Sequence, residues 1–184
     1  MASHPAGDDR SRIAPDTGVG CHGPVAKSSP LWSPRKTRWM LSLFPPLLLQ
    51  RVKIRSVAAD FADCTVVIRR SLLTRNLHGT TFGGTLFSGA DPIYPVLLWQ
   101  ALLRRGLDVE AWLEAATIEY AAPARSDITM RFPLEPAVLE AAETALRKDG
   151  RFRYAFSTLG RDERGVACVR LESKVHLKSR SVIR

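Results

Sequence analysis

The alternation of apolar and polar residues predicts four strands between residues 52 and 134. Two β-type runs cover residues 52–59 and 64–73, with a polar break at 60–63 between them. Residues 112–120 and 128–134 alternate in the same way, and a Pro-containing turn at 123–126 separates them. Such period-2 runs bounded by turn residues are typical of antiparallel strands.

The clearest alternation lies near the C-terminus. Residues 151–156 place aromatic side chains on every second position, and residues 167–178 alternate apolar residues with charged ones. The turn residues 162–165 suit a hairpin between them. A long strand with one charged face indicates an antiparallel sheet that is wet on one side.

Helical patterns cover three further stretches, two of them between these strands and one before the first strand. The stretch from Gly83 ends at Arg104-Arg105-Gly106, a cationic last turn followed by a stop glycine. It is apolar nearly all round, which predicts burial, and Pro92 and Pro95 predict a kink. Residues 136–148 form an additional helix, and residues 39–49 a short lead-in helix.

The expected element order is therefore β-β-α-β-β-α-β-β. A sheet of about six mostly antiparallel strands can bury one long apolar helix by wrapping around it. This α+β arrangement is the hotdog fold. Residues 39–184 are expected to form this one domain. Residues 1–38 lack hydrophobic periodicity and are expected to be a disordered tail, with Met40 as a candidate initiator.

Composition and charge say more about the protein's cellular surroundings than about the reaction it performs. The formal charge of +9 gives a surface that attracts polyanions, such as the phosphates of a coenzyme. Cys21, Cys64 and Cys168 have no C-x-x-C spacing and are expected to be reduced thiols of a cytoplasmic protein. Prolines interrupt the apolar run at 39–49, so neither a membrane span nor an export signal is expected.

Residues 76–91 carry the candidate chemistry. Gly83 and Gly84 open the apolar helix, where free N–H groups could polarise a thioester carbonyl and stabilise an oxyanion. Asp91 follows within the same apolar run and could handle a hydrolytic water. Two structural interpretations stay open: the glycines allow tight packing, and Asp91-Pro92 interrupts the helix.

This segment resembles the PaaI-like acyl-CoA thioesterases, and more closely the hotdog family related to the C-terminal domain of YiiD-type proteins. Asn76, Gly83, Gly84, Phe87, Ala90 and Asp91 fall on the pattern, and residues 91–94 match the Asp-Pro-x-Tyr of the YiiD-type branch. The resemblance spans residues 40–178 by element order. In one departure, Phe82 stands where PaaI-like enzymes commonly have a His.

The resemblance implies a role for each matched position. The Gly84 N–H would polarise the carbonyl, Asp91 would handle the water, and Asn76 would be a polar positioning group. Substrate-binding positions would be Gly83, Phe82, Phe87 and Tyr94. The site would lie between the start of the helix and a neighbouring subunit.

We therefore expect a thioesterase acting on acyl-CoA or an acyl-carrier substrate, as a homodimer or homotetramer. Coenzyme A would enter only as part of the substrate, and neither a metal nor another cofactor is expected. A non-catalytic acyl-CoA-binding or scaffold protein is the first alternative, because of Phe82. A basic nucleic-acid-binding protein is less favoured, because no solvent-facing strand combines aromatic and basic residues. A hotdog dehydratase or hydratase would need a His placed beside an acid.

Overall fold

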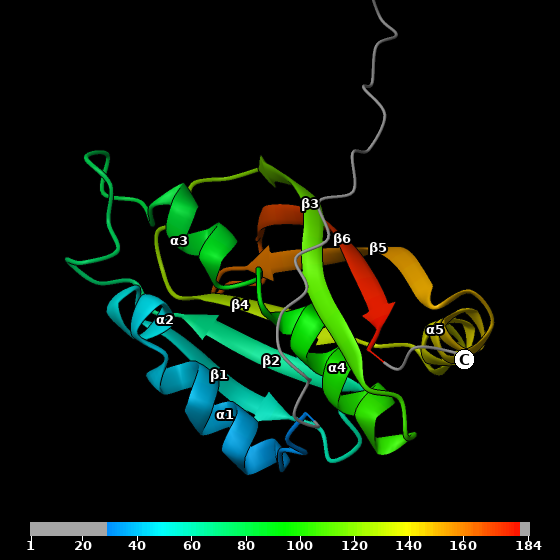
Figure 1. The fold of residues 1–184 in the computed structure, drawn as a ribbon. Coiled ribbons are helices and arrows are strands. Elements are labelled where there is room, and N and C mark those ends of the chain that lie inside the picture. The colour runs from blue at the N-terminus through cyan, green and yellow to red at the C-terminus, as the bar shows by residue number, and fades with distance from the viewer. Residues whose placement is uncertain (1–28, 181–184) are drawn as a thin grey trace, which may run out of the picture.

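One antiparallel sheet organises the protein. A computed structural model describes residues 29–180 and contains six strands in the order β1-β2-β4-β5-β6-β3 (Figure 1). Their bounds are β1 Val52–Val57, β2 Asp63–Ile68, β3 Val109–Tyr120, β4 Ile128–Pro133, β5 Arg151–Arg161 and β6 Ala167–Ser179. All five pairings are antiparallel, so the predicted sheet is confirmed.

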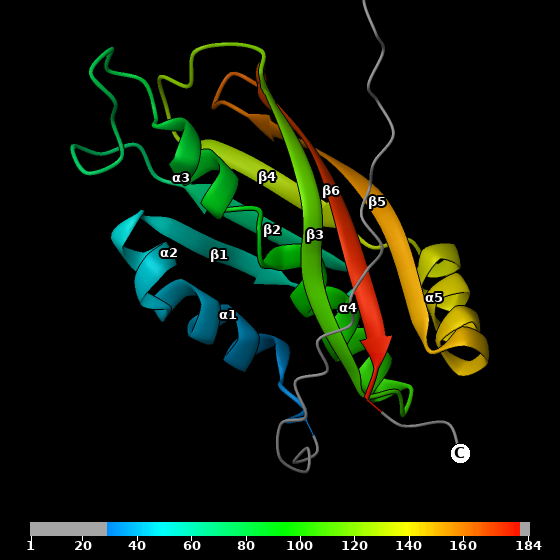
Figure 2. The same ribbon diagram turned by 45° about the horizontal axis from the view of Figure 1, so that its top comes forward.

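The central helix lies inside the curve of this sheet (Figures 1 and 2). It consists of α3 (Gly83–Ser88) and α4 (Ile93–Arg104), separated by a turn where a kink was predicted. The buried positions of α4 lie on most of its circumference: Ile93, Tyr94, Pro95, Leu97, Leu98, Gln100, Ala101 and Leu102. They pack against the inner faces of the strands and form one core. The predicted hotdog architecture is therefore confirmed.

Glycines follow the ends of both longer helices, and the stop at Gly106 is the one that the sequence predicts. Gly106 follows α4 at φ +78°, a left-handed conformation that glycine adopts without strain. The second is α5 (Pro136–Asp149), which ends at Gly150 in the same conformation and buries Val138, Ala142 and Leu146. An ion pair of 2.9 Å joins Arg105 to Glu143 on α5.

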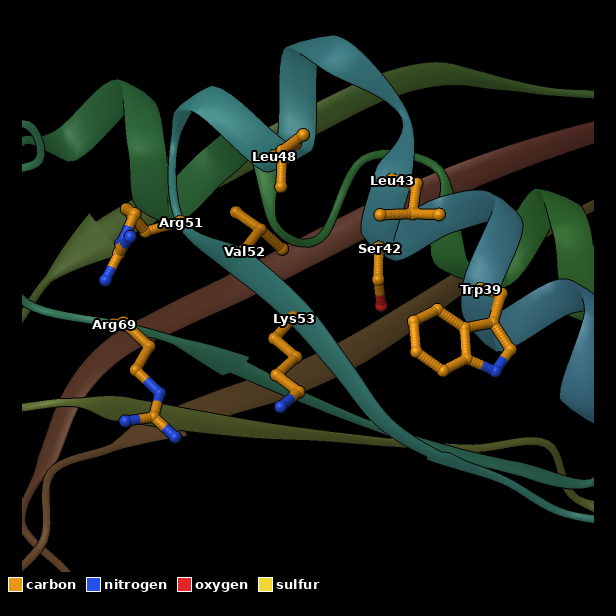
Figure 3. A pocket seen from close by; sticks show the side chains of 8 residues that line it. All are labelled: Trp39, Ser42, Leu43, Leu48, Arg51, Val52, Lys53 and Arg69. Atoms are coloured by element: carbon orange, nitrogen blue, oxygen red, sulfur yellow. The ribbon is translucent and has the colours of Figure 1, made fainter.

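The segment before β1 corrects the expected domain boundary. Helix α1 (Pro34–Leu43) begins before residue 38, and α2 (Pro45–Leu49) follows it. Thr37 on α1 is buried. Ser42 points toward β1 (Figure 3), where its Oγ accepts a hydrogen bond of 3.1 Å from the Ile54 N–H. The domain therefore includes residues 29–38; residues 1–28 of the expected tail lie outside the described residues.

Residues 29–33 are fixed by contacts with α4, far away in sequence. The Trp32 N–H donates to Gln100 Oε1 at 2.8 Å, and Gln100 Nε2 donates to the Pro30 carbonyl at 3.1 Å. The Trp32 and Trp99 rings meet edge to face at 5.1 Å. Gln100 is completely buried, so water cannot reach its side-chain amide. The backbone groups of Pro30 and Trp32 supply the hydrogen-bond partners that this amide needs.

A chain that starts at Met40 should be less stable than one that starts at Ser29. The shorter chain loses both Gln100 hydrogen bonds and the Trp32–Trp99 contact, together worth about 2–4 kcal/mol. We expect a melting temperature lower by about 5–10 °C in calorimetry. Equal melting temperatures would restore the boundary at residue 38.

Candidate functional site

Asn76 shapes the loop that leads into α3. Its side-chain Oδ1 accepts hydrogen bonds from the N–H groups of His78 (3.0 Å) and Thr80 (3.1 Å). Its Nδ2 donates to Thr80 Oγ1 at 2.8 Å. The polar groups of Asn76 are thus engaged within their own loop, so the side chain can position that loop beside a ligand.

The two glycines at the start of α3 each receive an aromatic side chain at close range. A Cβ on Gly83 would lie 2.6 Å from the Tyr120 hydroxyl, and a Cβ on Gly84 would lie 2.5 Å from Cε1 of Phe82. Within residues 29–180, neither glycine N–H donates a hydrogen bond. The glycines therefore serve tight packing and also leave free donors, so both interpretations from the sequence remain compatible with the geometry.

A cavity of about 620 Å³ opens beside this helix start. Three of the predicted site residues line it, namely Asn76, Phe82 and Gly83. The other lining residues are His78, Thr80, Thr81, Leu86, Tyr120, Ala121, Ala122, Pro123, Ala124 and Arg125. Most of these side chains are apolar or small, while Arg125 supplies an exposed cation.

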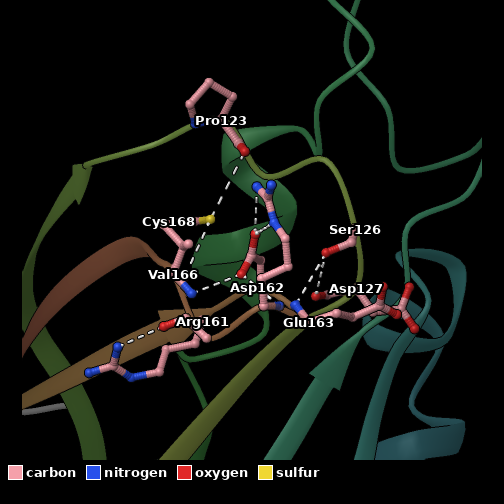
Figure 4. Close-up of polar contacts among 10 residues, drawn as sticks. Pro123, Ser126, Asp127, Arg161, Asp162, Glu163, Val166 and Cys168 are labelled. Atoms are coloured by element: carbon pink, nitrogen blue, oxygen red, sulfur yellow. Dashed lines mark hydrogen bonds and ion pairs between the residues drawn. The ribbon is translucent and has the colours of Figure 1, made fainter.

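The wall formed by residues 121–125 is anchored to the β5–β6 hairpin (Figure 4). The Glu163 N–H donates to Ser126 Oγ at 3.3 Å, and the Cys168 thiol lies 4.0 Å from the Pro123 carbonyl oxygen. On the other side, the Thr81 N–H donates to the Ala124 carbonyl at 2.9 Å. The cavity therefore lies between the helix start and the end of β3, and the hairpin supports one of its walls.

Asp91 lies in the turn between α3 and α4 rather than in the cavity wall. Its N–H donates to the Phe87 carbonyl at 3.1 Å, but its carboxylate is exposed and has no hydrogen bond or ion pair within residues 29–180. Desolvation by the surrounding protein raises the pKa of Asp91 above its ordinary value. An unpaired carboxylate with a raised pKa is suited to accept a proton.

The two aromatic residues predicted to bind substrate lie elsewhere. Phe87 is half-buried and packs against the core. Tyr94 is buried: its ring stacks on Phe156 at 3.9 Å, and its hydroxyl lies 3.2 Å from Thr158 Oγ1. Burial raises the pKa of Tyr94. Neither residue lines the cavity beside Gly83, and the contacts of Tyr94 are those of a core residue.

Sequence reasoning missed several residues of the cavity wall. The alternation identifies Tyr120 only as the end of a predicted strand, and no matched motif position falls on His78. Arg125 lay within a predicted turn. The sequence signal for this wall is the predicted turn at residues 123–126, directly after a predicted strand. Loops at strand ends often carry binding residues.

Solved structures with the same architecture come from several bacteria. A Pseudomonas aeruginosa protein of unknown function, described as a probable thioesterase, matches with a TM-score of 0.69 at 16% identity, covering 77% of this chain and 93% of that one. A Haemophilus influenzae thioesterase matches with a TM-score of 0.60 at 11% identity (85% and 98% covered). The PaaI protein of the Escherichia coli phenylacetic acid degradation operon matches with a TM-score of 0.52 at 17% identity (77% and 90%).

These matches and the wrapped helix define the chain as a hotdog-fold protein. Identities this low establish the fold alone. A comparison with curated proteins finds no significant match. A family model described as a domain of unknown function, DUF4442, matches residues 35–177, and the protein belongs to this family. The match begins at the start of α1, in agreement with the corrected domain boundary.

Tyr94→Phe should destabilise the protein by about 1 kcal/mol. The change removes a buried hydroxyl pair with Thr158 but keeps the stacked ring. The expected result is a lower urea midpoint at unchanged slope. Tyr120→Phe is the matched control, because the exposed Tyr120 hydroxyl makes no hydrogen bond within residues 29–180. Equal midpoints for the two variants would contradict the core role of Tyr94.

Proposed function

We propose that the protein hydrolyses acyl-CoA thioesters in the cavity at the start of α3. The observation that supports this most is the Gly83 N–H, which has no acceptor and lies at a cavity of about 620 Å³, followed in the chain by the equally free N–H of Gly84. Donors of this kind stabilise the oxyanion of a tetrahedral intermediate, which is the main requirement of thioester hydrolysis. The solved thioesterases with the same fold support the reaction class.

The surroundings of the cavity suit the two ends of an acyl-CoA. Phe82, Leu86 and Pro123 offer apolar contacts for an acyl chain. Arg125 is exposed at the cavity and fits the phosphates of the coenzyme. The net charge of +9 would favour approach of this anionic substrate.

In the proposed reaction, the Gly84 N–H donates to the thioester oxygen while Asp91 accepts a proton from water. The water oxygen attacks the carbonyl carbon, the tetrahedral intermediate breaks its C–S bond, and the proton held by Asp91 passes to the leaving thiolate. A free thiol and a carboxylic acid result. Asp91 would thus act as general base and then as general acid.

One chain does not offer both groups to a single carbonyl. Gly84 lies at the start of α3, Asp91 lies in the turn after the end of α3, and Asp91 is outside the cavity of its own chain. We infer that Asp91 serves the cavity of a neighbouring subunit. Its exposure and its lack of a partner in the single described chain support this arrangement.

A non-catalytic acyl-CoA-binding protein remains the second candidate. The Phe82 ring lies against Gly84, and it replaces the His that the resemblance places before the glycine pair. Such a protein would keep the cavity and the affinity but not the turnover.

Asp91→Asn should lower kcat by roughly 10²–10⁴-fold, since it keeps the shape but removes the base. The assay is release of free thiol from short, long and aromatic acyl-CoAs. The wild-type rate should fall as the pH drops through the raised pKa of Asp91, and the variant should lack this limb. Full activity in the variant would refute the mechanism.

The same variant should not lose stability. A pKa raised by folding means that the ionised Asp91 disfavours the folded state, and this cost vanishes only below the unfolded-state pKa. Asp91→Asn should therefore melt at the same temperature or higher at pH 7. Gly84→Ala is a second variant, and the atoms nearest to its new methyl belong to the exposed Phe82 ring. Turnover that is absent in the wild type but present in Phe82→His would favour the binding protein.

The protein should form a dimer through β3. This strand lies at a sheet edge and exposes residues 115–117 along it, and unpaired edges invite a second strand. Ala116→Lys with Thr117→Lys should weaken dimerisation at least about tenfold, as seen by light scattering across a dilution series. Val166→Lys, at an exposed position outside β3, is the control. A monomeric wild type at micromolar concentration would contradict the assembly.

A further inference from the structure

The outer side of α1 and α2 carries a cluster of large apolar side chains in solvent. We call it the α1–α2 face and define it by Trp39, Met40, Leu43, Phe44, Leu48 and Leu49, which are between 48% and 70% exposed. Six neighbouring residues of this size on one surface exceed the scattered apolar exposure of ordinary proteins. The face is independent of the cavity beside Gly83, whose lining residues it does not share.

Two hollows make this face continuous. One of about 330 Å³ lies between α1, α2 and β1, and another of about 380 Å³ lies along α1 and the start of α2. Trp39 and Leu43 line both hollows. In the first hollow, the side chains of Lys53 and Arg69 lie across from Leu43 and Leu48 (Figure 3).

The segment that carries the face has charges of a single sign. Residues 29–59 contain no Asp or Glu but six cations: Arg35, Lys36, Arg38, Arg51, Lys53 and Arg55. All six are exposed. Arg69 at the first hollow is exposed as well and forms an ion pair of 3.8 Å with Asp127. The Arg38 guanidinium lies 5.8 Å from the centre of the Trp39 ring, so cations border the apolar surface directly.

The apolar residues of the face are not needed to hold α1 in place. The opposite side of α1 holds the helix in place: Thr37 is buried there, and Ser42 Oγ accepts a hydrogen bond from an N–H of β1. Leu47 fixes α2 to the core in the same way. The exposed residues are therefore available to another molecule.

We propose that the α1–α2 face binds the surface of an anionic lipid bilayer. Its apolar side chains would enter the boundary between headgroups and acyl chains, while the cations contact anionic headgroups. The juxtaposition of an apolar centre with a mainly basic border favours lipid over nucleic acid, because four of the six apolar residues are aliphatic and offer no ring on which a base could stack. No helix within residues 29–180 is long and apolar enough to cross a membrane, so this is attachment at the surface.

The test is flotation of the full chain with phosphatidylcholine vesicles, with and without about 30% phosphatidylglycerol. We expect binding to the anionic vesicles at least about tenfold stronger than to the neutral ones, weakening as salt is added. Binding that is absent, or equal for both vesicles, would overturn the proposal.

Matched variants separate the face from the overall charge. Trp39→Ser, Leu43→Ser and Phe44→Ser together should abolish vesicle binding at an unchanged melting temperature. If that variant does not fold, Arg35, Arg38 and Lys53 changed to Gln should weaken binding at least about tenfold. The control with equal charge loss, Lys148, Arg151 and Lys178 changed to Gln, should bind like the wild type.

Two outcomes would assign the face differently. Vesicle binding that survives in the folded serine variant would place the lipid contact elsewhere. Absent vesicle binding together with a self-association that the serine variant loses in light scattering would identify a second copy as the occupant. Either result overturns the proposal, and neither bears on thioester hydrolysis.

Discussion

Enclosure of α4 is the constraint on which the rest of the molecule depends. A helix with apolar side chains on most of its circumference is stable only when protein surrounds it. The six strands curve to provide that surrounding (Figure 2), and the stack of Tyr94 on Phe156 fixes the helix against β5. Because α4 occupies the centre of the core, α3 lies toward its edge. The first residues of α3 therefore contact the end of β3 at Tyr120. The cavity beside Gly83 follows from how the core is packed.

The turn between α3 and α4 allows a carboxylate to lie next to this apolar core without being buried in it. If Asp91 lay inside α4, its ionised carboxylate would be removed from water with no charged or hydrogen-bonding partner. The free-energy cost of that burial would destabilise the helix. Pro92 has no N–H to donate, and the chain turns at residues 89–92. Asp91 thereby reaches the surface, where desolvation is only partial and raises its pKa without keeping it out of reach. The break that weakens the helix is thus what leaves a titratable group accessible.

Local pattern predicted the elements well, because strand alternation and helix stops are short-range signals. It extended β2 to residue 73, whereas the strand ends at Ile68 and Leu72 is exposed in the following loop. The family resemblance assigned Tyr94 to a ligand, and an almost wholly apolar helix does not itself reveal which side faces the sheet. The pattern missed residues 29–33 because their order depends on Gln100, about seventy residues away. It also began the lead-in helix too late, although Ser33 caps α1 locally by accepting a hydrogen bond from the Lys36 N–H.

The two sheet edges are finished in chemically different ways, and this bears on how the protein assembles. Ser42 of α1 occupies an N–H on the outer side of β1, while β3 has a strand neighbour on one side only. The acids of β3 are already neutralised within the sheet, as Glu114 is by Arg153 at 2.9 Å. A second β3 would therefore meet free backbone groups with little charge repulsion. The α1–α2 face, at the opposite edge, offers apolar side chains and cations instead. Strand pairing and lipid contact would thus use separate surfaces, and a dimer could present two α1–α2 faces at once.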